Sequence, residues 1–537
     1  MPALGGYDSE AIDATRETAL RHLICLRRWR NLITSPLFRL PNELIVEIYM
    51  RAVDDNDLRW LALTAICHRL REIFVSSPRL WGVVDFHFAH LAKLFLQRCN
   101  FDPRLISALD FGFASRGGIG REALWRELDG RTLNNLHFLL FKGSEEEFNQ
   151  RVADLLRRAP NLSSLELNTC SRDTWELELP LGDQIPHLSM LKINRLQISW
   201  CSPLLRNLTK LVLESTGIRT PEVSFTPMEA LLTVLANSPD LEHLCLVSVP
   251  DLPDDNEDDC TMVVRLHHLK VLDLQFNEHR VVGCILSHIW YPRFTKVRVE
   301  ADYDPGVDLS VVLSQVIPRP RPGTETLQNL RRTKTVSINM STTYDLTADN
   351  FCIALRPLDD DHDAIEDPET LRRFASKIVE VIGRETVINL DVDFDFSFEL
   401  PFEMWRELFY GFNRLERISY FGNLSTPPIN FVDPFCWALC EPLEGGPVCP
   451  RLWDLRIPGG FAQGLSAVFL RFALAARSVS GRRLRRISLA RWFKEEETLV
   501  LNYFSDVVDE VSRPQDTRPY SQPVVSDCNG GDVVANH

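Results

Sequence analysis

Cysteine, histidine and carboxylate groups are the side chains of this sequence that could bind a metal or take part in catalysis. Cys436 and Cys440 are four residues apart and Cys449 follows, but no His-x-x-x-His partner completes a zinc site. The pair Cys67 and His68 has no such partner either. None of the thirteen cysteines forms a C-x-x-C pair. We interpret them as small buried side chains that a cytosolic protein keeps reduced.

Two acidic segments suggest a cation site or a catalytic pair at first sight. The run RPLDDDHDAIEDPETL, residues 356–371, lacks the glycine and the closing glutamate of a calcium-binding EF-hand loop. In FDFSFE, residues 394–399, apolar residues alternate as in a strand, which places Asp393 and Asp395 on one exposed face. We therefore expect a solvated loop and an exposed strand face at these two places.

Common nucleotide-binding and hydrolase motifs are absent from the sequence. It contains no P-loop, no dinucleotide fingerprint after a strand, no G-x-S-x-G and no H-E-x-x-H. The sequence therefore predicts no catalytic residue, no metal site and no cofactor. The alternative, an enzyme on an α/β sheet, would need a concave pocket with converging titratable groups.

Length and charge narrow the class of protein. At 537 residues the chain is too long for one compact core, and 45% hydrophobic residues are ordinary for a globular protein. The net charge of −15 argues against neutralising nucleic-acid phosphates and against binding an anionic membrane. The N-terminus has no apolar core of signal-peptide type, and no apolar run is long enough to span a membrane. We expect a cytoplasmic or nuclear protein.

The stretch FRLPNELIVEIY, residues 38–49, has more apolar positions than one buried helix face needs. Pro41 suits the first turn of a helix. Leu44 and Ile48 share one face of that helix, and Ile45 belongs to an adjacent face. A helix with two apolar faces lies deep in a core or packs between its own domain and a partner.

Further short helices are predicted on either side of this stretch. Apolar residues recur at helical spacing from Leu58 through RLREIF, residues 69–74, and Ser76-Ser77-Pro78 ends the pattern. Three short helices make a core that is marginal alone, so such a unit usually borrows surface from a partner or from the next domain. Upstream, residues 8–32 are predicted to form one helix with a basic C-terminal end.

Taken in order, these residues resemble an F-box of the fungal F-box-like type. The resemblance rests on Leu40-Pro41, Ile48, a helix over Leu61–Cys67, Arg69–Ile73 and the closing PRLW at Pro78, and it covers about residues 36–86. It implies binding of the adaptor Skp1 and, through it, of a cullin-RING ubiquitin ligase. Carried over by position, the adaptor-binding residues would be Leu40, Pro41, Ile45 and Ile48. The alternative is that residues 40–81 are three helices of a larger helical core.

A strand-like LxxLxL motif recurs through the rest of the chain. Its clearest copies start at Leu162, Leu188, Leu208, Leu241 and Leu269. Weaker copies start at Trp81, Ile106, Leu136, Phe294, Val387, Leu452 and Leu484. Apolar helical stripes precede several copies. A repeated helix and strand at this period is typical of a solenoid, because one unit cannot bury its own apolar stripe.

These copies resemble the irregular leucine-rich repeats that often follow an F-box. The resemblance implies an α/β solenoid whose variable strand positions bind a target protein. These positions should project from one sheet face and are Lys192, Lys210, Glu214, His243, Asp273, Gln275 and Arg298. Their mixed charges favour a protein over a phosphate. The alternative is an ordinary α/β domain with a parallel sheet.

The predicted fold class is therefore α/β, with a small three-helix F-box lobe followed by an irregular leucine-rich-repeat solenoid. The predicted domains are an N-terminal helical segment (1–36), an F-box-like domain (37–86), the solenoid (87–505) and a disordered tail (506–537). The predicted function is a non-catalytic substrate-recognition subunit of an SCF-type (Skp1–cullin–F-box) E3 ubiquitin ligase. We expect no nucleic-acid or membrane partner. The alternative function is a leucine-rich-repeat scaffold that binds proteins without ligase function.

Overall fold

A computed structural model gives the fold in two compact units. Unit 1 comprises Met1–Leu241 with Val249–Asp251, and unit 2 comprises Glu242–Ser248 with Leu252–His537. The structure describes residues 9–52, 61, 64–85, 89–100, 106, 108–111, 133–134, 136–143, 152–169, 175–176, 188–215, 218–219, 227–249, 262–276, 278–317, 328–340, 343–358, 367–394, 400–422, 433–443, 446–458, 464–490 and 502–512.

Unit 1 begins with helices, as predicted. They are α1 (Ser9–Thr34), the 3-10 helix η1 (Pro36–Arg39), α2 (Asn42–Ala52), α4 (His68–Val75) and the 3-10 helix η2 (Pro78–Trp81). Helix α1 confirms the single helix predicted over residues 8–32. We refer to the described part of residues 36–85 as the N-terminal lobe.

The helix expected over Leu61–Cys67 differs from the structure. Residues 64–66 form a turn, which Thr64 Oγ1 closes by donating to Leu61 O at 2.6 Å. Cys67 has an extended backbone (φ −154°, ψ 160°) and is the N-cap of α4, where its Sγ accepts from Leu70 N at 3.5 Å. The extended residue breaks the helical periodicity, so α4 starts as a separate helix at His68.

The remainder of unit 1 is a parallel sheet with helices. Its strands β1, β2, β3, β4, β6 and β8 are hydrogen-bonded in that order, and every pair is parallel. Their bounds are β1 (Val83–Asp85), β2 (Ala108–Phe111), β3 (Phe138–Gly143), β4 (Ser164–Thr169), β6 (Met190–Asn194) and β8 (Lys210–Glu214). The unit also holds α5 (Ala89–Arg98), α8 (Ala153–Arg158), the 3-10 helix η4 (Pro203–Leu205), α9 (Pro227–Ala236), and the short strands β5 (Trp175–Glu176), β7 (Leu196–Ser199) and β9 (Ile218–Arg219).

Unit 2 contains a second run of mostly parallel strands. Their order is β10, β12, β14, β17, β16, β15, β18, β19, β22, β23 and β24, and among these only β16 runs antiparallel to its neighbours. Their bounds are β10 (His243–Val247), β12 (Val271–Phe276), β14 (Lys296–Tyr303), β15 (Thr335–Met340), β16 (Tyr344–Ala348), β17 (Phe351–Pro357), β18 (Asn389–Phe394), β19 (Arg417–Gly422), β22 (Asp454–Pro458), β23 (Leu484–Ala490) and β24 (Val508–Ser512). Two short pairs, β11 (Val264–Arg265) with β13 (Ile289–Trp290) and β20 (Pro442–Leu443) with β21 (Gly446–Pro447), lie outside this sheet.

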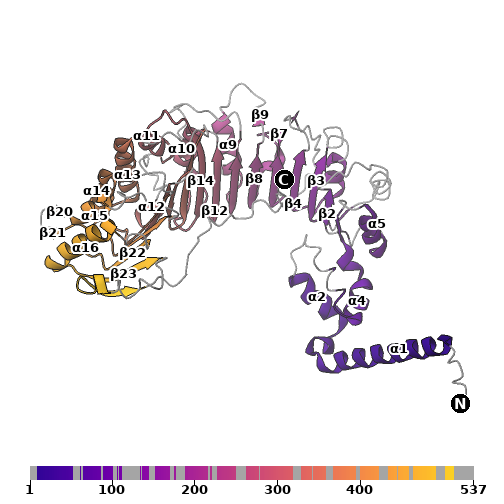
Figure 1. Cartoon of the computed structure of the whole chain (residues 1–537). Coiled ribbons are helices and arrows are strands. Elements are labelled where there is room, and N and C mark those ends of the chain that lie inside the picture. The colour runs from indigo at the N-terminus through magenta and orange to yellow at the C-terminus, as the bar shows by residue number, and fades with distance from the viewer. Residues whose placement is uncertain are drawn as a thin grey trace, which may run out of the picture. The chain divides into compact units, whose positions relative to one another are not determined.

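The helices of unit 2 gather on one side of its sheet (Figure 1). They are α10 (His279–His288), α11 (Leu309–Val316), α12 (Gln328–Arg331), α13 (Pro368–Ile382), α14 (Phe402–Gly411), α15 (Asp433–Cys440) and α16 (Gly464–Val479). Helices α10, α11, α13, α14, α15 and α16 pack against one another in that order. Asp367 caps α13, with its Oδ1 accepting from Glu369 N at 3.0 Å.

Side chains alternate between two environments along the strands. In β4, Leu165 and Leu167 are fully buried while their neighbours are half-buried, and β6 repeats the pattern at Leu191 and Ile193. The two sides of β4 and β6 therefore differ, as the LxxLxL pattern predicts, whereas β8, β10 and β12 each bury three consecutive residues. Each clear and weak copy of the motif coincides with a strand. Both units are mixed α/β structures built on mostly parallel strands.

Two predicted domain limits differ from the structure. The range 87–505 spans both compact units, whose boundary is adjacent to the acidic, proline-containing segment 250–261. The predicted disordered tail begins at 506, but residues 508–512 form β24, which pairs in parallel with β23. The rest of that tail, residues 513–537, lies outside the described residues. No helix in the described part of the chain combines the length and apolar character needed to cross a membrane.

Candidate protein-binding surfaces

The N-terminal lobe has a small apolar core, which continues into α5 because the Trp81 and Phe95 ring centroids are 4.9 Å apart. Its buried side chains are Ile45, Val46, Leu70, Ile73, Phe74, Leu80 and Trp81. The rings of Tyr49 and Phe74 have centroids 4.9 Å apart, which fastens α2 to α4. Trp81 Nε1 donates to Phe74 O at 3.0 Å, so the PRLW segment closes the lobe onto the end of α4.

The four residues predicted to bind the adaptor fall into different environments. Pro41 is exposed, Leu40 is half-buried and Ile48 is 50% exposed. Ile45 is only 2% exposed, so the prediction of a docking role for it needs correction: its side chain fills the lobe core. Leu44 is 50% exposed and was not among the predicted residues.

The start of α2 determines which side chains are exposed. Leu44 N and Ile45 N donate to Pro41 O at 3.1 and 3.2 Å, so the helical turn starts directly at the proline. Leu44 and Ile48 are four residues apart and therefore lie on the same helix face. Together with Pro41 they form an exposed apolar patch, which we call the docking patch. Exposed apolar side chains also occur on α1, among them Leu26 and Trp29. The docking patch is a candidate protein-binding site.

The target-binding residues predicted in unit 1 share one face of its sheet. The register aligns Lys210 with Met190 and Glu214 with Asn194, so Lys192, Lys210 and Glu214 project on the same side. Lys192 Nζ lies 3.2 Å from Glu214 Oε1, and Asn194 Nδ2 donates to Glu214 Oε2 at 2.9 Å. Both charges of this ion pair are less than one fifth exposed, which holds them in a fixed arrangement.

The predicted residues of unit 2 also share one face. The register aligns Asp273 with Arg298 and Gln275 with Glu300, and His243 lies on the same side of β10. Gln275 Nε2 donates to Asp273 Oδ1, and Arg298 donates to Glu300 Oε2, each at 3.1 Å. Asp273 is 1% exposed, so a target cannot reach it directly and its role is to orient Gln275. This corrects the prediction for that residue.

A further charged group on the unit 2 face was not predicted from the sequence. The fully buried carboxylate of Asp454 lies 2.8 Å from Arg417 Nε, 2.7 Å from an Arg486 amino group and 3.5 Å from Arg456 Nε. The guanidinium groups of Arg417 and Arg486 also lie over the Trp453 ring, at 5.8 and 5.6 Å from its centroid. Burial acts to raise the pKa of Asp454, but the Arg486 hydrogen bond and the nearby arginine charges outweigh it and lower that pKa.

Other carboxyl groups of this face have the opposite shift. Burial raises the pKa of Asp302, Asp345 and Asp391 above the ordinary value for aspartate. For Asp391 the hydrogen bond from Ser419 and the charges of Arg456 and Arg417 only partly oppose this effect. The face therefore combines ionised and less readily ionised carboxyl groups with half-buried arginines. Such a mixed polar surface suits recognition of a protein more than recognition of one uniform charge.

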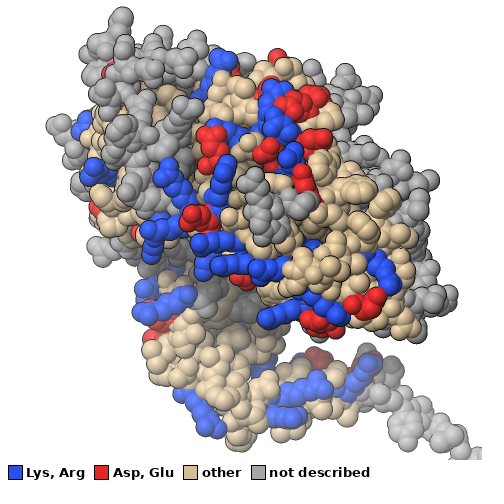
Figure 2. All heavy atoms as spheres, turned by 90° about the vertical axis from the view of Figure 1, so that its left-hand side faces the viewer, with Lys and Arg blue, Asp and Glu red and all other residues tan. Residues whose placement is uncertain are grey.

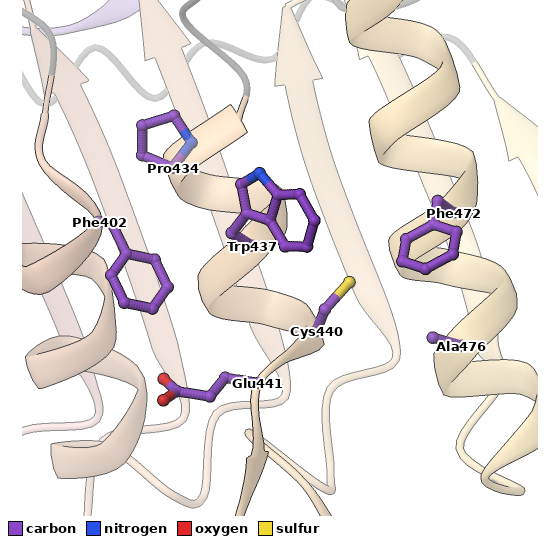
Figure 3. A pocket seen from close by; sticks show the side chains of 7 residues that line it. All are labelled: Phe402, Pro434, Trp437, Cys440, Glu441, Phe472 and Ala476. Atoms are coloured by element: carbon purple, nitrogen blue, oxygen red, sulfur yellow. The ribbon is translucent and has the colours of Figure 1, made fainter.

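A pocket of about 670 Å³ lies on the helix side of unit 2 (Figure 3). It is lined by Phe402, Pro434, Trp437, Cys440, Glu441, Phe472 and Ala476. Figure 3 shows the side chains of Cys440 and Glu441 pointing away from each other. Burial raises the pKa of the Cys440 thiol, and Glu441 Oε2 lies 3.1 Å from Arg406 Nε. The pocket thus offers mainly apolar contact surface, without converging titratable groups among its described lining.

Neither a metal site nor a comparison with known proteins assigns a function to the described residues. Among the residues that the structure describes, no three His, Cys, Asp or Glu side chains are grouped so as to hold a metal ion. No known family model matches the chain, and no curated protein sequence matches it. The docking patch, the strand faces and the sequence resemblance are therefore the features that bear on function.

Proposed function

We propose that the protein is a substrate-recognition subunit of an SCF-type E3 ubiquitin ligase in the cytoplasm or nucleus. The observation that carries this proposal is the docking patch. Leu44 and Ile48 are each half exposed beside the exposed Pro41, although the lobe core beneath them is filled. An apolar pair left on the surface of so small a lobe is explained by a partner, for which the F-box resemblance supplies the Skp1-type adaptor.

The remainder of the chain would hold the target. Its helices and parallel strands alternate along the sequence, and the unit 2 helices pack in series, which supports the proposed irregular leucine-rich-repeat solenoid. The polar strand faces would be the target-binding surface. Their ion pairs, such as Lys192 with Glu214, fix side-chain positions before a target arrives, which lowers the ordering cost of binding.

In this role the chain supplies binding and positioning, and the ubiquitin-transfer chemistry belongs to the other subunits. A repeat scaffold without ligase function is the second candidate. The polar strand faces favour it equally, because they need no adaptor to bind a protein. The two candidates differ in whether the adaptor and the cullin both assemble on the chain.

Co-purification tests the proposal. The full chain is expressed with a Skp1-type adaptor and a cullin, and the expected result is a complex containing all three. The variant Leu44→Glu with Ile48→Glu should lose both partners, because charges replace the exposed apolar pair. The matched control is Leu358→Glu with Val479→Glu, which places two charges at exposed apolar positions of unit 2 and should retain both. If the wild-type chain binds neither the adaptor nor the cullin, the ligase function is excluded and the scaffold function is the candidate that stays.

A further inference from the structure

The turns that lead into five neighbouring strands of unit 2 carry exposed cations. Strands β15, β18, β19, β22 and β23 are parallel neighbours, so the turns that enter them lie along one edge of the sheet. The exposed cations there are Arg331, Arg332, Lys334, Arg384, Arg414, Arg451, Arg482, Arg483 and Arg485, which we call the basic edge. Figure 2 faces this end of the chain and shows a band of Lys and Arg side chains with fewer acidic ones beside it.

The strand register shows that these cations form a regular row. Thr335, Asn389, Arg417, Asp454 and Arg486 are aligned across the five strands. Four of the five turns have an arginine three residues before the aligned residue of their strand. These arginines are Arg332, Arg414, Arg451 and Arg483. Neighbouring strands are about 4.8 Å apart, so the five turns span about 19 Å.

Few carboxylates neutralise this row. Arg483 pairs with Asp509 at 2.9 Å, but the other eight side chains make no ion pair with any residue that the structure describes. The other described carboxylates beside this row are the exposed Glu385, the half-buried Glu416 and the exposed Asp349, which accepts from Lys334 N at 3.0 Å and from Thr335 N at 3.4 Å. Among the residues that the structure describes, cations therefore outnumber carboxylates along this row, in a chain whose net charge is −15. Exposed arginines without an ion pair to a described residue can bind carboxylates through two parallel hydrogen bonds.

Favourable interaction with helix dipoles accounts for only part of this pattern. A cation just after a helix is stabilised by the partial negative charge at the helix C-terminus. This applies to Arg331 at the end of α12, to Arg384 after α13, to Arg414 after α14 and to Arg482 after α16. It does not apply to Arg451, which follows the short strand β21, and it does not require several cations in the turn before β23.

We propose that the basic edge binds an extended acidic segment of a partner protein. About six residues of an extended chain cover the 19 Å row. A single-stranded nucleic acid fits less well, because Trp453 is the one aromatic ring among the described residues of these turns that is not fully buried, and it is already stacked against Arg417 and Arg486. This site is separate from the docking patch and does not depend on ligase function.

Fluorescence anisotropy with the full chain tests this site. The probes are a fluorescein-labelled peptide of alternating Glu and Ser, the same peptide with Lys in place of Glu, and a labelled oligo(dT) of similar length. The edge variant is Arg414→Glu, Arg451→Glu and Arg482→Glu. The control variant, Arg27→Glu, Arg28→Glu and Arg30→Glu, makes the same charge change at exposed positions of α1.

The acidic peptide should bind the wild type at low salt, and raising the salt should weaken binding. The edge variant should bind at least about tenfold more weakly, while the control variant binds as the wild type and thermal unfolding is unchanged in both. Tighter binding of oligo(dT) than of the acidic peptide would overturn the proposal in favour of a nucleic acid. The proposal would also be overturned if the edge and control variants lost equal affinity for the acidic peptide. It would likewise be overturned if the wild type did not bind this peptide.

Discussion

A single buried carboxylate organises three arginines on the unit 2 face. Asp454 is completely inaccessible and accepts hydrogen bonds from Arg417 and Arg486. The arginines are each about one third exposed, so they keep donors for a target while Asp454 fixes their positions. Removing that carboxylate would leave three like charges near one another.

We predict that Asp454→Asn lowers the free energy of unfolding by about 2 kcal/mol, since the amide keeps one acceptor but loses the charge that compensates the arginines. Urea denaturation of the full chain measures this change. Glu385→Gln is the control: Glu385 is exposed and forms no ion pair with a residue that the structure describes, so the change should alter stability by less than about 0.5 kcal/mol. Equal stability of Asp454→Asn and wild type would show that the arginines do not need their carboxylate.

The same residue gives a prediction for pH. The pKa of Asp454 is lower in the folded chain than in the unfolded chain. A lowered folded pKa contributes stability above the unfolded value, about 3.9, and that contribution is lost as the pH falls through the folded pKa. The stability difference between wild type and Asp454→Asn should therefore be full at pH 7 and shrink below about pH 4. Urea titrations at both pH values measure it, and a difference that grows in acid contradicts the assignment.

At the scale of elements, the apolar pattern of the sequence predicts where many strands lie. It does not predict the direction of β16 or which face of α2 is buried. The LxxLxL copies located parallel strands because alternate leucines must be buried against helices. The antiparallel strand β16 went unrecognised, since YDLTA lacks that pattern. In α2 both the Leu44–Ile48 face and the Ile45 face are apolar, and only packing against α4 decides which is buried. The Asp454 cluster joins residues from three strands distant in sequence, so no local spacing reveals it.

The two faces of α2 should respond differently to truncation. Leu44→Ala with Ile48→Ala should weaken binding of a Skp1-type adaptor by about tenfold or more, because central apolar anchors cost about 2 kcal/mol each when truncated. It should leave thermal unfolding almost unchanged, since both side chains are half exposed. Ile45→Ala should instead destabilise the lobe by about 2 kcal/mol or more through a core cavity. Calorimetric binding and thermal unfolding separate these outcomes, and adaptor affinity unaffected by the double change would contradict the docking patch.

Helix packing in unit 2 depends on a glycine. A Cβ at Gly283 of α10 would overlap the backbone carbonyl of Gln315 in α11, so the two helices could not keep their present distance. We predict that Gly283→Ala lowers the free energy of unfolding by about 3 kcal/mol, at the upper end for overpacking, because backbone must move. Gly306→Ala is the matched control, since its Cβ would meet only the Asp304 side chain at 3.3 Å. Urea denaturation should rank the two variants clearly, and similar midpoints would argue against close α10–α11 packing.

At the scale of the whole molecule, the C-terminal limit of the folded chain lies later than the composition indicates. Polar residues and prolines near the end predicted disorder from residue 506. The structure instead buries Val507 and Val508 and pairs β24 with β23. Asp506 and Asp509 also form ion pairs, with Arg471 at 2.7 Å and Arg483 at 2.9 Å. One buried valine in a short polar strand and one just before it are too few to give a recognisable period, so only the neighbouring strand reveals their role.

Two truncated chains test this limit. Removal of residues 513–537 should leave the unfolding midpoint unchanged, because the sequence there is rich in polar residues, proline and glycine. Removal of residues 506–537 should lower the free energy of unfolding by about 3 kcal/mol or more, since burial of each valine contributes about 1.5 kcal/mol or more. It also exposes the edge of β23, which promotes association between chains. Urea denaturation and light scattering measure both effects. If the two truncated chains prove equally stable and equally monomeric, β24 is not part of the folded sheet and the limit predicted at residue 506 holds.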